Sequence, residues 1–560
     1  MRCTAWFSRS SEEIWLAPVV GLALTIGASA SVAQGISVNT YHNDTLRTGW
    51  NSREISLTSS VVGGGTFGLL HQVSLDAQVD AQPLVVAGLS IGGATHDVAY
   101  IATEGNTVYA IDASSGAILK QANLGSPAAL PAICNSKTGA TIGINSTPVI
   151  DPVARALYVI AYVDVGGTPV YYLHALSLTT LSDTVPPLLV SASNTLSNGK
   201  TVYSFSAGMV RQRAALLETE GNIYVAFAGL CGQRNTTARG WLLGWSASML
   251  APLAKQQLTN RVLPSNSPND FFLTSIWMSG YGPSSGSNGD VFFATGNSDP
   301  SGTTYDSTNA INLSESVVEW SPSQGKVVSF FSPTDPGADV ATLDRGDLDF
   351  GSGGVMLLPA QPGLFRHLAV AAGKVGVMYL MKQGNLGGQN SGNVLGEYAV
   401  GNCWCGPSYF EGPDAIGRVV SSGGSSIKVW DVQSSPTTAL VPDADFTPPS
   451  ISTGQDPGFF TSISSNGTTA GSAVIWAVNR PFDTTKDVTL YAFDAAAGTQ
   501  LFSAVAGSWP SSKNANLVPT VANGKVYVAS YKMLSIFGIA GPASPLNPES
   551  KLARPASPIR

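Results

Sequence analysis

The stretch with the clearest potential for chemistry is a short acidic loop. Asp344, Asp347 and Asp349 lie close together in the chain, and Arg345 is the only basic residue among them. A carboxylate acts as a general base when its pKa suits the working pH, and oxygens of this kind also bind cations. Carboxylates this close need a cation, a basic partner or open water. The loop therefore predicts a functional acidic site, with a solvated acidic turn as the plain alternative.

The cysteines offer a second kind of chemistry. After Cys3, near the amino terminus, four remain: Cys134, Cys231, Cys403 and Cys405. An even number in an oxidising compartment favours disulfides, and we favour the pairs Cys134–Cys231 and Cys403–Cys405 over the other pairings. A metal site at the CWC motif is disfavoured, because the chain has only 5 His and no HxH or HExxH spacing.

Composition predicts an all-β protein. The 560 residues include 60 Gly and 34 Pro, and only 12% are charged, which suits short strands and tight turns rather than long helices. The net charge of −7 and the pI near 5.3 argue against a nucleic-acid partner, which would need a basic face.

The amino terminus has the pattern of an export signal. Two arginines precede an apolar stretch from Ile14 to Ile26, and small residues up to Ala33 suit cleavage before Gln34. We therefore expect residues 1–33 to be a signal peptide and the mature protein to be secreted or periplasmic. The apolar stretch is too short to cross a bilayer, so we expect no membrane span. At the other end, the Pro- and Ser-rich residues 541–560 are expected to be disordered.

The rest of the chain repeats one kind of unit. Its clearest copy is VAYIATEGNTVYAIDASSGAILK, from Val98 to Lys120, which alternates strand-like runs with glycine turns. About eight such units follow one another at a spacing of roughly 50–75 residues, which indicates a repeat architecture. Sheets repeated radially form a β-propeller. We therefore predict an eight-bladed β-propeller of four-stranded antiparallel blades over residues 34–540.

Closure of this propeller is predicted from the two ends of the chain. The last unit lacks an obvious fourth strand, and FGLLHQVSLD, from Phe67 to Asp76, can supply it. Such an N-terminal strand would remove the open sheet edges. A solenoid is the competing architecture, but it needs capping repeats, which the sequence does not show.

The stretches YAIDASSGAIL and YAFDAAAGTQLF resemble the repeat of quinoprotein alcohol dehydrogenases. These are eight-bladed propellers that bind pyrroloquinoline quinone on their axis. The resemblance covers most of the mature chain and is more specific for the fold than for function. This chain departs from the family at one position of the repeat. The family has a docking tryptophan four residues after the repeat glycine, whereas three repeats of this chain have Lys120, Ser329 and Phe502 there.

A sharper likeness to this family lies in the middle of the chain. IWMSGYGP, FATGNSDP, DRGDLDFGSGG and AAGKVGVMYL follow the order and spacing of its cofactor motifs. By this resemblance, Trp277 would be the floor for the flat cofactor and Asn297 a ligand of a calcium ion. Asp349 would be the general base, and Lys374 would donate to the quinone oxygen. The alternatives are purely structural roles: Trp277 would be a core aromatic residue, Asn297 part of a turn, and Lys374 part of a solvated turn.

Two further departures from the family bear on catalysis. The family's second calcium ligand is a Glu four residues before an Arg-Gly pair, and Asn235 holds that place here. The family's adjacent-cysteine disulfide over the quinone also has no match, because Cys403 and Cys405 lie in a different unit. A second resemblance, carried by TYHNDTLRTGWN, AQPLVV and STPVIDP, is to uncharacterised secreted bacterial propellers and implies the fold without a substrate.

These observations support two functions. The first is a non-catalytic secreted propeller that binds a protein, glycan or small ligand on its axial face, which accounts for the departures from the family. The alternative is a dehydrogenase that oxidises an alcohol or sugar with pyrroloquinoline quinone and calcium, with Asp349 as general base. A propeller hydrolase or lyase that uses the acidic loop is a third reading, without a clear motif to support it.

Overall fold

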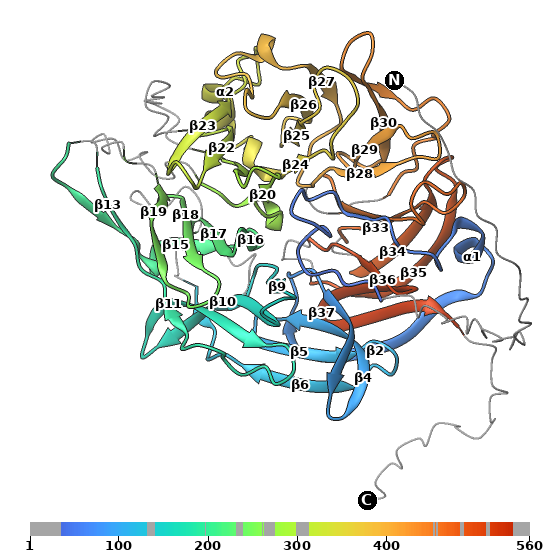
Figure 1. Ribbon diagram of the computed structural model, residues 1–560, viewed down its shortest axis with the longest axis horizontal. Helices are drawn as coiled ribbons and strands as arrows, with labels where there is room; N and C mark the ends of the chain where they lie inside the picture. The colour runs from blue at the N-terminus through green and yellow to red at the C-terminus, as the bar shows by residue number, and fades with distance from the viewer. Residues whose placement is uncertain are drawn as a thin grey trace, which may run out of the picture. The chain divides into compact units, whose positions relative to one another are not determined.

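Eight sheets follow one another along the chain and around a common centre, which confirms the predicted β-propeller (Figure 1). Strands that are neighbours within a blade pair antiparallel. The computed structural model describes residues 35–130, 141–196, 198–230, 239–259, 261, 275–297, 313–451, 454, 457–481, 486–510 and 516–540.

Blades 1 to 4 come from residues 84–331. In order, they comprise β3 (Leu84–Ile91), β4 (Ala94–Ala102), β5 (Thr107–Asp112) and β6 (Ile118–Asn123); β9 (Val149–Asp151), β10 (Ala156–Val165), β11 (Thr168–Ser177) and β12 (Leu188–Leu189); β15 (Val210–Gln212), β16 (Leu217–Thr219), β17 (Asn222–Gly229), β18 (Trp241–Ser246) and β19 (Pro252–Thr259); and β20 (Ser284–Ser285), β21 (Val291–Ala294), β22 (Val317–Ser321) and β23 (Lys326–Phe331).

Blades 5 to 8 follow in the same way. They comprise β24 (Val355–Leu357), β25 (Leu368–Ala372), β26 (Val377–Lys382) and β27 (Gly396–Ala399); β28 (Ser408–Glu411), β29 (Gly417–Ser421), β30 (Lys428–Gln433) and β31 (Ala439–Pro442); β32 (Phe460–Ser464), β33 (Val474–Val478), β34 (Asp487–Asp494) and β35 (Gln500–Ser508); and β36 (Thr520–Ala522), β37 (Lys525–Ile539) and β2 (Phe67–Gln78).

A few elements lie outside this pattern. They are β1 (Trp50–Asn51), parallel to β32; the hairpins β7 (Ala128–Ala129) with β8 (Thr141–Ile142) and β13 (Ser193–Thr195) with β14 (Val202–Ser204); the helices α1 (Ser59–Gly63) and α2 (Val340–Gly346); and the 3-10 turns η2 (Ala207–Met209), η3 (Met278–Gly280), η4 (Phe350–Ser352) and η5 (Ser391–Asn393).

The middle strands of the blades are buried on both faces, because each blade packs between two others. All of β5 is buried, and so is β10 from Ala156 to Val163. Both strands are consequently rich in apolar residues, although β5 also buries the polar Thr107 and Asp112. Outer strands such as β6 face water and are mostly exposed. The core accordingly lies between the blades, filled by large side chains such as Trp241, Trp320 and Trp476.

The predicted closure by an N-terminal strand is confirmed. β2 pairs antiparallel with β37, with Phe67 opposite Ile539, so that the beginning and the end of the propeller share one blade. Phe67 also packs against Phe502, with ring centroids 4.9 Å apart, so Phe502 contributes an aromatic contact to this closure.

Several predictions fall on parts of the chain outside the described residues. These are the signal peptide at residues 1–33, the tail at 541–560, the pair Cys134–Cys231 and the departure at Asn235. Among the described residues, no helix combines the length and the hydropathy needed to cross a bilayer.

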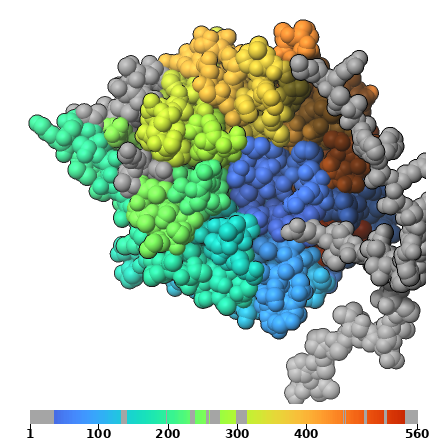
Figure 2. All heavy atoms as spheres, in the orientation of Figure 1, coloured from blue at the N-terminus to red at the C-terminus, as the bar shows by residue number. Residues whose placement is uncertain are grey.

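A segment from residue 36 to 51, here called the axial segment, runs through the centre of the ring. Figure 2 shows this part of the chain in dark blue, enclosed by the other blades. It hydrogen-bonds to all eight blades in turn: Val38 with Val85, Asn39 with Ile150, Arg47 with Leu216, Thr45 with Ser285, Leu46 with Leu357, Thr48 with Tyr409, Gly49 with Ile463, and Asn51 with Val521. The backbone groups on the inner edges of the blades would otherwise lack hydrogen-bond partners, and the axial segment supplies them.

Arg47 is the centre of this arrangement. Its fully buried guanidinium donates hydrogen bonds to the carbonyl oxygens of Pro283 (2.9 Å), Leu216 (3.0 Å) and Tyr41 (2.8 Å) and to the hydroxyl of Thr40 (2.6 Å). It therefore ties the axial segment to blades 3 and 4.

We predict that Arg47→Met lowers the free energy of unfolding by at least about 3 kcal/mol, because it leaves several buried acceptors without a donor. Denaturant unfolding followed by tryptophan fluorescence measures the change. The exposed Arg53→Met is the matched control and should change stability little. An Arg47→Met protein as stable as the control would contradict the role given to the axial segment.

Glu319 in β22 provides a pH-dependent contribution to stability. The residue is 1% exposed, and its Oε2 accepts a hydrogen bond from the Gly384 N–H at 2.8 Å. Burial raises the pKa of Glu319 to about 7, and Asp290 adds to the rise. The folded state therefore keeps its proton at pH values where the unfolded chain has lost it.

We predict that stability falls by on the order of 2 kcal/mol as the pH rises from about 4.5 to 7, because the folded state binds more protons across this window. The Glu319→Gln variant should lose most of this slope, whereas the exposed Glu220→Gln should retain it. Thermal unfolding across the pH series tests this, and parallel profiles for wild type and Glu319→Gln would refute it.

Candidate functional site

The four residues matched to the quinoprotein motifs occupy equivalent positions in blades 4 and 5. Trp277 directly precedes η3 and β20, and Asn297 follows β21. In the next blade, Asp349 precedes η4 and β24, and Lys374 follows β25. Because the first two strands of a blade are antiparallel, the beginning of one and the end of the other lie at the same end of the sheet. The four residues therefore share one axial end of two neighbouring blades.

The structure brings all four side chains together. The Lys374 Nζ atom lies 2.5 Å from Asp349 Oδ2, and the Asn297 backbone N–H donates to Asp349 Oδ1 at 3.0 Å. The same ammonium lies 5.7 Å from the centre of the Trp277 ring. Trp277 is half-buried, whereas the other three are buried. The residues thus form one cluster, while the roles taken from the family stay predictions.

The acidic loop has a basic partner, and it is Lys374 rather than Arg345. The ammonium donates to the backbone carbonyl of Asp347 at 2.8 Å and lies 3.4 Å from Asp347 Oδ2. Burial by itself would lower the pKa of Lys374, but the carboxylates of Asp349 and Asp347 hold it above its ordinary value. Arg345 is exposed and reaches only its helix neighbour Thr342, at 3.5 Å. Asp349 is therefore held in a buried ion pair with Lys374, whereas Asp347 and Arg345 of the same loop are exposed to solvent.

The glycine before Asn297 is needed for this geometry. A Cβ atom on Gly296 would lie 2.4 Å from Asp349 Oδ1 and 3.1 Å from Trp277 Nε1. Any side chain there would push apart the carboxylate and the indole. The TGN motif therefore does more than make a turn, because it lets two loops of different blades meet.

Strained backbone surrounds the cluster. Met278, Ser279, Glu315 and Asp347 all have positive φ, between 43° and 52°, although none of them is glycine. Such conformations cost on the order of 1–3 kcal/mol each and persist where the surrounding structure imposes them, often at ligand sites. Four such residues therefore lie around Trp277 and Asp349, although others occur elsewhere, including His42, Asn43 and Arg47 of the axial segment.

Glu315 is a residue of the site that the sequence did not single out. It is fully buried, its N–H donates to the Gly296 carbonyl at 3.2 Å, and its Oε2 accepts from the Phe350 N–H at 2.5 Å. Burial raises the pKa of Glu315 well above its ordinary range, and Asp349 raises it further, which favours the neutral form. Glu315 thus links the loop of Asn297 to the loop of Asp349. The only signal in the sequence is a charged residue at the start of an apolar strand.

Trp404 is a second residue that the sequence analysis did not place here. Cys403 and Cys405 are joined by a disulfide, with Cα atoms 4.9 Å apart, and they carry Trp404 on the loop that leads into β28. The Cys403 N–H donates to the carbonyl of Gly373 at 3.2 Å, which docks this loop against that of Lys374. The Trp404 ring centre lies 5.3 Å from the Lys374 Nζ atom. The CWC motif of blade 6 therefore places a second aromatic ring beside the cluster.

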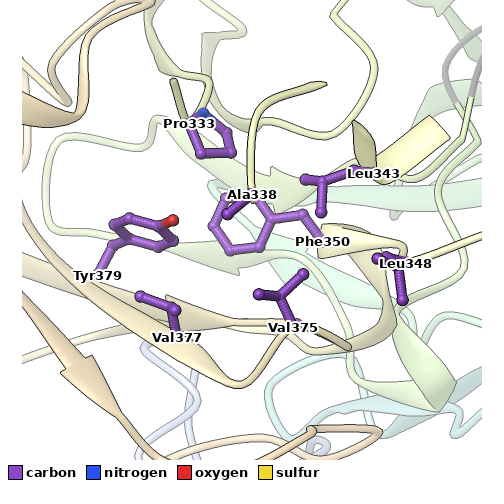
Figure 3. A pocket seen from close by; sticks show the side chains of 9 residues that line it. Pro333, Ala338, Leu343, Leu348, Phe350, Val375, Val377 and Tyr379 are labelled. Carbon is purple, nitrogen blue, oxygen red and sulfur yellow. The ribbon is translucent and has the colours of Figure 1, made fainter. Parts of the chain in front are cut away.

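A small apolar cavity lies beside the acidic loop. It has a volume of about 10 Å³ and is lined by apolar side chains of α2, the Asp349 loop and β26, among them Leu343, Phe350 and Val377 (Figure 3). This volume is about that of a single water molecule, and the apolar walls offer no hydrogen bonds. The cavity is thus a gap in the apolar packing beneath the acidic loop and not the ligand site.

Comparison with known proteins identifies the fold. No protein-family model matches the chain, and no curated protein matches it by sequence. Among solved structures, the quinohemoprotein alcohol dehydrogenase from Comamonas testosteroni is similar, with a TM-score of 0.57 and 15% identity over 95% of this chain and 83% of that one. A europium-containing methanol dehydrogenase has a TM-score of 0.56 and 11% identity over 90% and 98% of the two chains.

A third similar structure is the quinohemoprotein alcohol dehydrogenase ADHIIG from Pseudomonas putida HK5. Its TM-score is 0.51, with 13% identity over 94% of this chain and 82% of that one. The chain therefore has the propeller fold of the quinoprotein alcohol dehydrogenases. Identities this low establish the fold and leave the activity to be argued from the site.

We predict that Lys374→Met lowers the free energy of unfolding by about 3 kcal/mol or more, because it leaves the buried Asp349 carboxylate without its cation. The double variant Lys374→Met/Asp349→Asn should recover most of this loss. Chemical denaturation of wild type, Lys374→Met, Asp349→Asn and the double variant gives the coupling energy, with exposed Lys326→Met as control. Additive effects would show that Lys374 and Asp349 do not act as a pair.

Proposed function

We propose that this chain is a binding module that holds a planar small ligand at the axial end of blades 4 and 5, without quinone catalysis. The observation that carries the proposal is the position of the Lys374 ammonium between the carboxylates of Asp347 and Asp349. The chain's own cation pairs with both carboxylates of the acidic loop, and the half-buried ring of Trp277 lies beside it. These groups suit recognition of a ring and need no added cation.

A planar conjugated ligand fits the chemistry of this site. An indole offers a large aromatic face, and cations at the rim of a stacked ring interact with its polar groups. Trp277 and Lys374 are the residues that would hold the ring of pyrroloquinoline quinone, with Trp404 on the other side of the ammonium. When bound, such a quinone supplies a two-electron oxidant.

Calcium fits the same residues poorly. The ion takes six to eight oxygen ligands, and carboxylates are the strong ones. The Asn297 Oδ1 atom is buried without a hydrogen-bond partner and has the chemistry of a ligand. However, Lys374 lies between the two carboxylates, and the described residues contain no cluster of three acidic, His or Cys side chains placed for a metal. We therefore derive no step through calcium.

The alternative function is the dehydrogenase. It is favoured by the meeting of Trp277, Asn297, Asp349 and Lys374 in one cluster, which the family's motifs predict residue by residue. In that case Asp349 would accept the alcohol proton, and Lys374 would stabilise negative charge on the reduced ligand.

The cellular location belongs to the same proposal. The amino-terminal sequence supports export to the periplasm or the medium, where a free-standing binding protein would meet small ligands directly. The net charge of −7 accords with a partner that is not a nucleic acid.

We predict that the purified chain binds pyrroloquinoline quinone with an affinity that EDTA does not change, and that it reduces no dye when alcohols or sugars are added. Trp277→Ala should weaken binding at least tenfold, because the ring loses its stacking surface. Isothermal titration calorimetry measures the affinity, and absorbance follows the dye.

The control for this experiment is Trp430→Phe, which changes a buried tryptophan in blade 6 and should leave binding intact. Dye reduction by wild type that disappears in Asp349→Asn, while binding persists, would establish the dehydrogenase and overturn the binding module. No binding to wild type would overturn both.

A further inference from the structure

Blade 6 carries a second cavity, far from the candidate site. Its volume is about 390 Å³, which is within the range of pockets that bind small molecules. The cavity is lined by the turn between β28 and β29, by β30 and β31, and by Gln361 and Pro362 of blade 5. That turn joins the end of the first strand to the beginning of the second. It therefore lies at the axial end opposite to Trp277 and Lys374.

The walls of this space, here called the blade-6 cavity, are largely apolar. Ile416 and Val441 line it and are 38% and 40% exposed, and Pro362 and Val432 lie beside them. Among the described residues that line the cavity, Asp431 of β30 is the only charged one. Apolar walls with one charged group are typical of a pocket that orients a small organic ligand.

Asp431 lies next to Arg418, but the hydrogen bonds of this arginine go to other carboxylates. The Nε–H group donates to Asp443 Oδ2 at 3.0 Å, and the two Nη groups donate to Asp414 at 2.8 and 2.9 Å. Asp431 Oδ1 is 3.2 Å from Nε, whose single hydrogen is thus already in use. None of the described residues donates a hydrogen bond to this buried oxygen.

Three carboxylates therefore share one guanidinium, which leaves the group with negative charge in excess. Burial raises the pKa of Asp431, and Asp443 and Asp414 raise it further, while Arg418 opposes them. The Asp431 side chain is 30% exposed although its Oδ1 atom is buried, so the rest of the carboxylate is open to the cavity. A cation in the cavity would supply both the missing charge and a hydrogen-bond donor.

The cation that suits this cavity is organic. A metal ion needs several oxygen ligands, and the described residues contain no group of three acidic, His or Cys side chains placed to hold one. An ammonium group needs only one carboxylate and donates its other hydrogens to neutral acceptors or water. The apolar side chains of Ile416 and Val441 would then cover the body of the ligand.

We propose that the blade-6 cavity binds a small amphipathic amine, with the ammonium against Asp431 and the apolar body between Ile416 and Val441. The site is separate from the axial site of blades 4 and 5 and does not depend on the function proposed for it. The protein would thus have two ligand sites, one at each end of the propeller.

The test compares two probes with the same apolar body. Hexylamine carries an ammonium group at neutral pH, whereas 1-hexanol is uncharged. Calorimetric titration at pH 7 should show saturable binding of hexylamine at least tenfold tighter than that of 1-hexanol. Asp431→Asn should weaken binding of the amine about 10- to 100-fold and leave the alcohol unchanged, because it removes a charge-assisted hydrogen bond.

Three further variants place the binding site. Val441→Trp fills the exposed rim of the cavity and should weaken binding of both probes. Asp487→Asn removes an exposed carboxylate from blade 7 and should leave both affinities unchanged. Trp277→Ala should bind hexylamine like wild type, because its ring belongs to the other end of the propeller.

The contrary outcomes are distinct. If hexylamine and 1-hexanol bind alike, or if wild type shows no saturable binding of the amine, the inference is overturned. Equal losses in Asp431→Asn and Asp487→Asn would show a general attraction of amines to an acidic protein and would overturn it too. Unchanged amine binding in Val441→Trp would place the ligand elsewhere. None of these results bears on the quinone titration, which reports on Trp277.

Discussion

The inner edges of the blades impose the constraint on which the rest of this structure depends. A ring of sheets buries the faces of each blade between its neighbours, but the first strand of every blade still presents unpaired backbone groups toward the axis. The axial segment satisfies these groups by forming hydrogen bonds to one blade after another. Arg47, buried at its centre, holds the segment against blades 3 and 4 by donating to the carbonyl oxygens of Leu216 and Pro283. The loop that carries Trp277 contacts the axial segment, because the Tyr281 hydroxyl donates to the Arg47 carbonyl.

The site follows from the same architecture. Each blade ends its second strand and begins its first at the same axial end, so neighbouring blades offer pairs of loops that face one another. In blades 4 and 5 these loops approach so closely that Gly296 admits no side chain, and several non-glycine residues adopt positive φ. A rigid ring can hold such strain because every loop is fixed at both ends by a paired strand. The result is a cluster in which Lys374, a residue of the chain itself, pairs with the carboxylates of Asp347 and Asp349.

The pairing of Lys374 with Asp347 and Asp349 bears on whether the protein has kept the enzymatic activity of the proteins whose fold it shares. The fold is that of quinoprotein alcohol dehydrogenases, and the four residues matched to their motifs meet in one cluster. Yet the position of Lys374 between two carboxylates leaves little room for a divalent ion. The aromatic rings of Trp277 and Trp404 and the Lys374 ammonium beside both of them suit the binding of a flat ligand. This holds whether or not the bound ligand reacts. The two functions thus share one recognition surface and differ in what happens after binding.

Sequence alone determined the architecture, because repetition is a property of the chain itself. The glycine-punctuated unit at Val98 to Lys120 recurs, and a radial ring is the arrangement that buries every copy. The strand from Phe67 was predictable as the closing strand, since the last unit lacked one. The cluster of Trp277, Asn297, Asp349 and Lys374 was predictable as a set from motifs, although its geometry was not.

Tertiary structure alone decided which groups meet. Lys374 became the partner of the acidic loop because its blade places it there, although Arg345 is nearer in sequence. Glu315 and Trp404 come from different blades and share no motif, so nothing in their spacing predicted a common site. The axial segment forms hydrogen bonds to eight blades, some of which are hundreds of residues away along the chain. Local pattern specifies a strand or a turn, but a pairing across the ring depends on closure, which only the folded chain achieves.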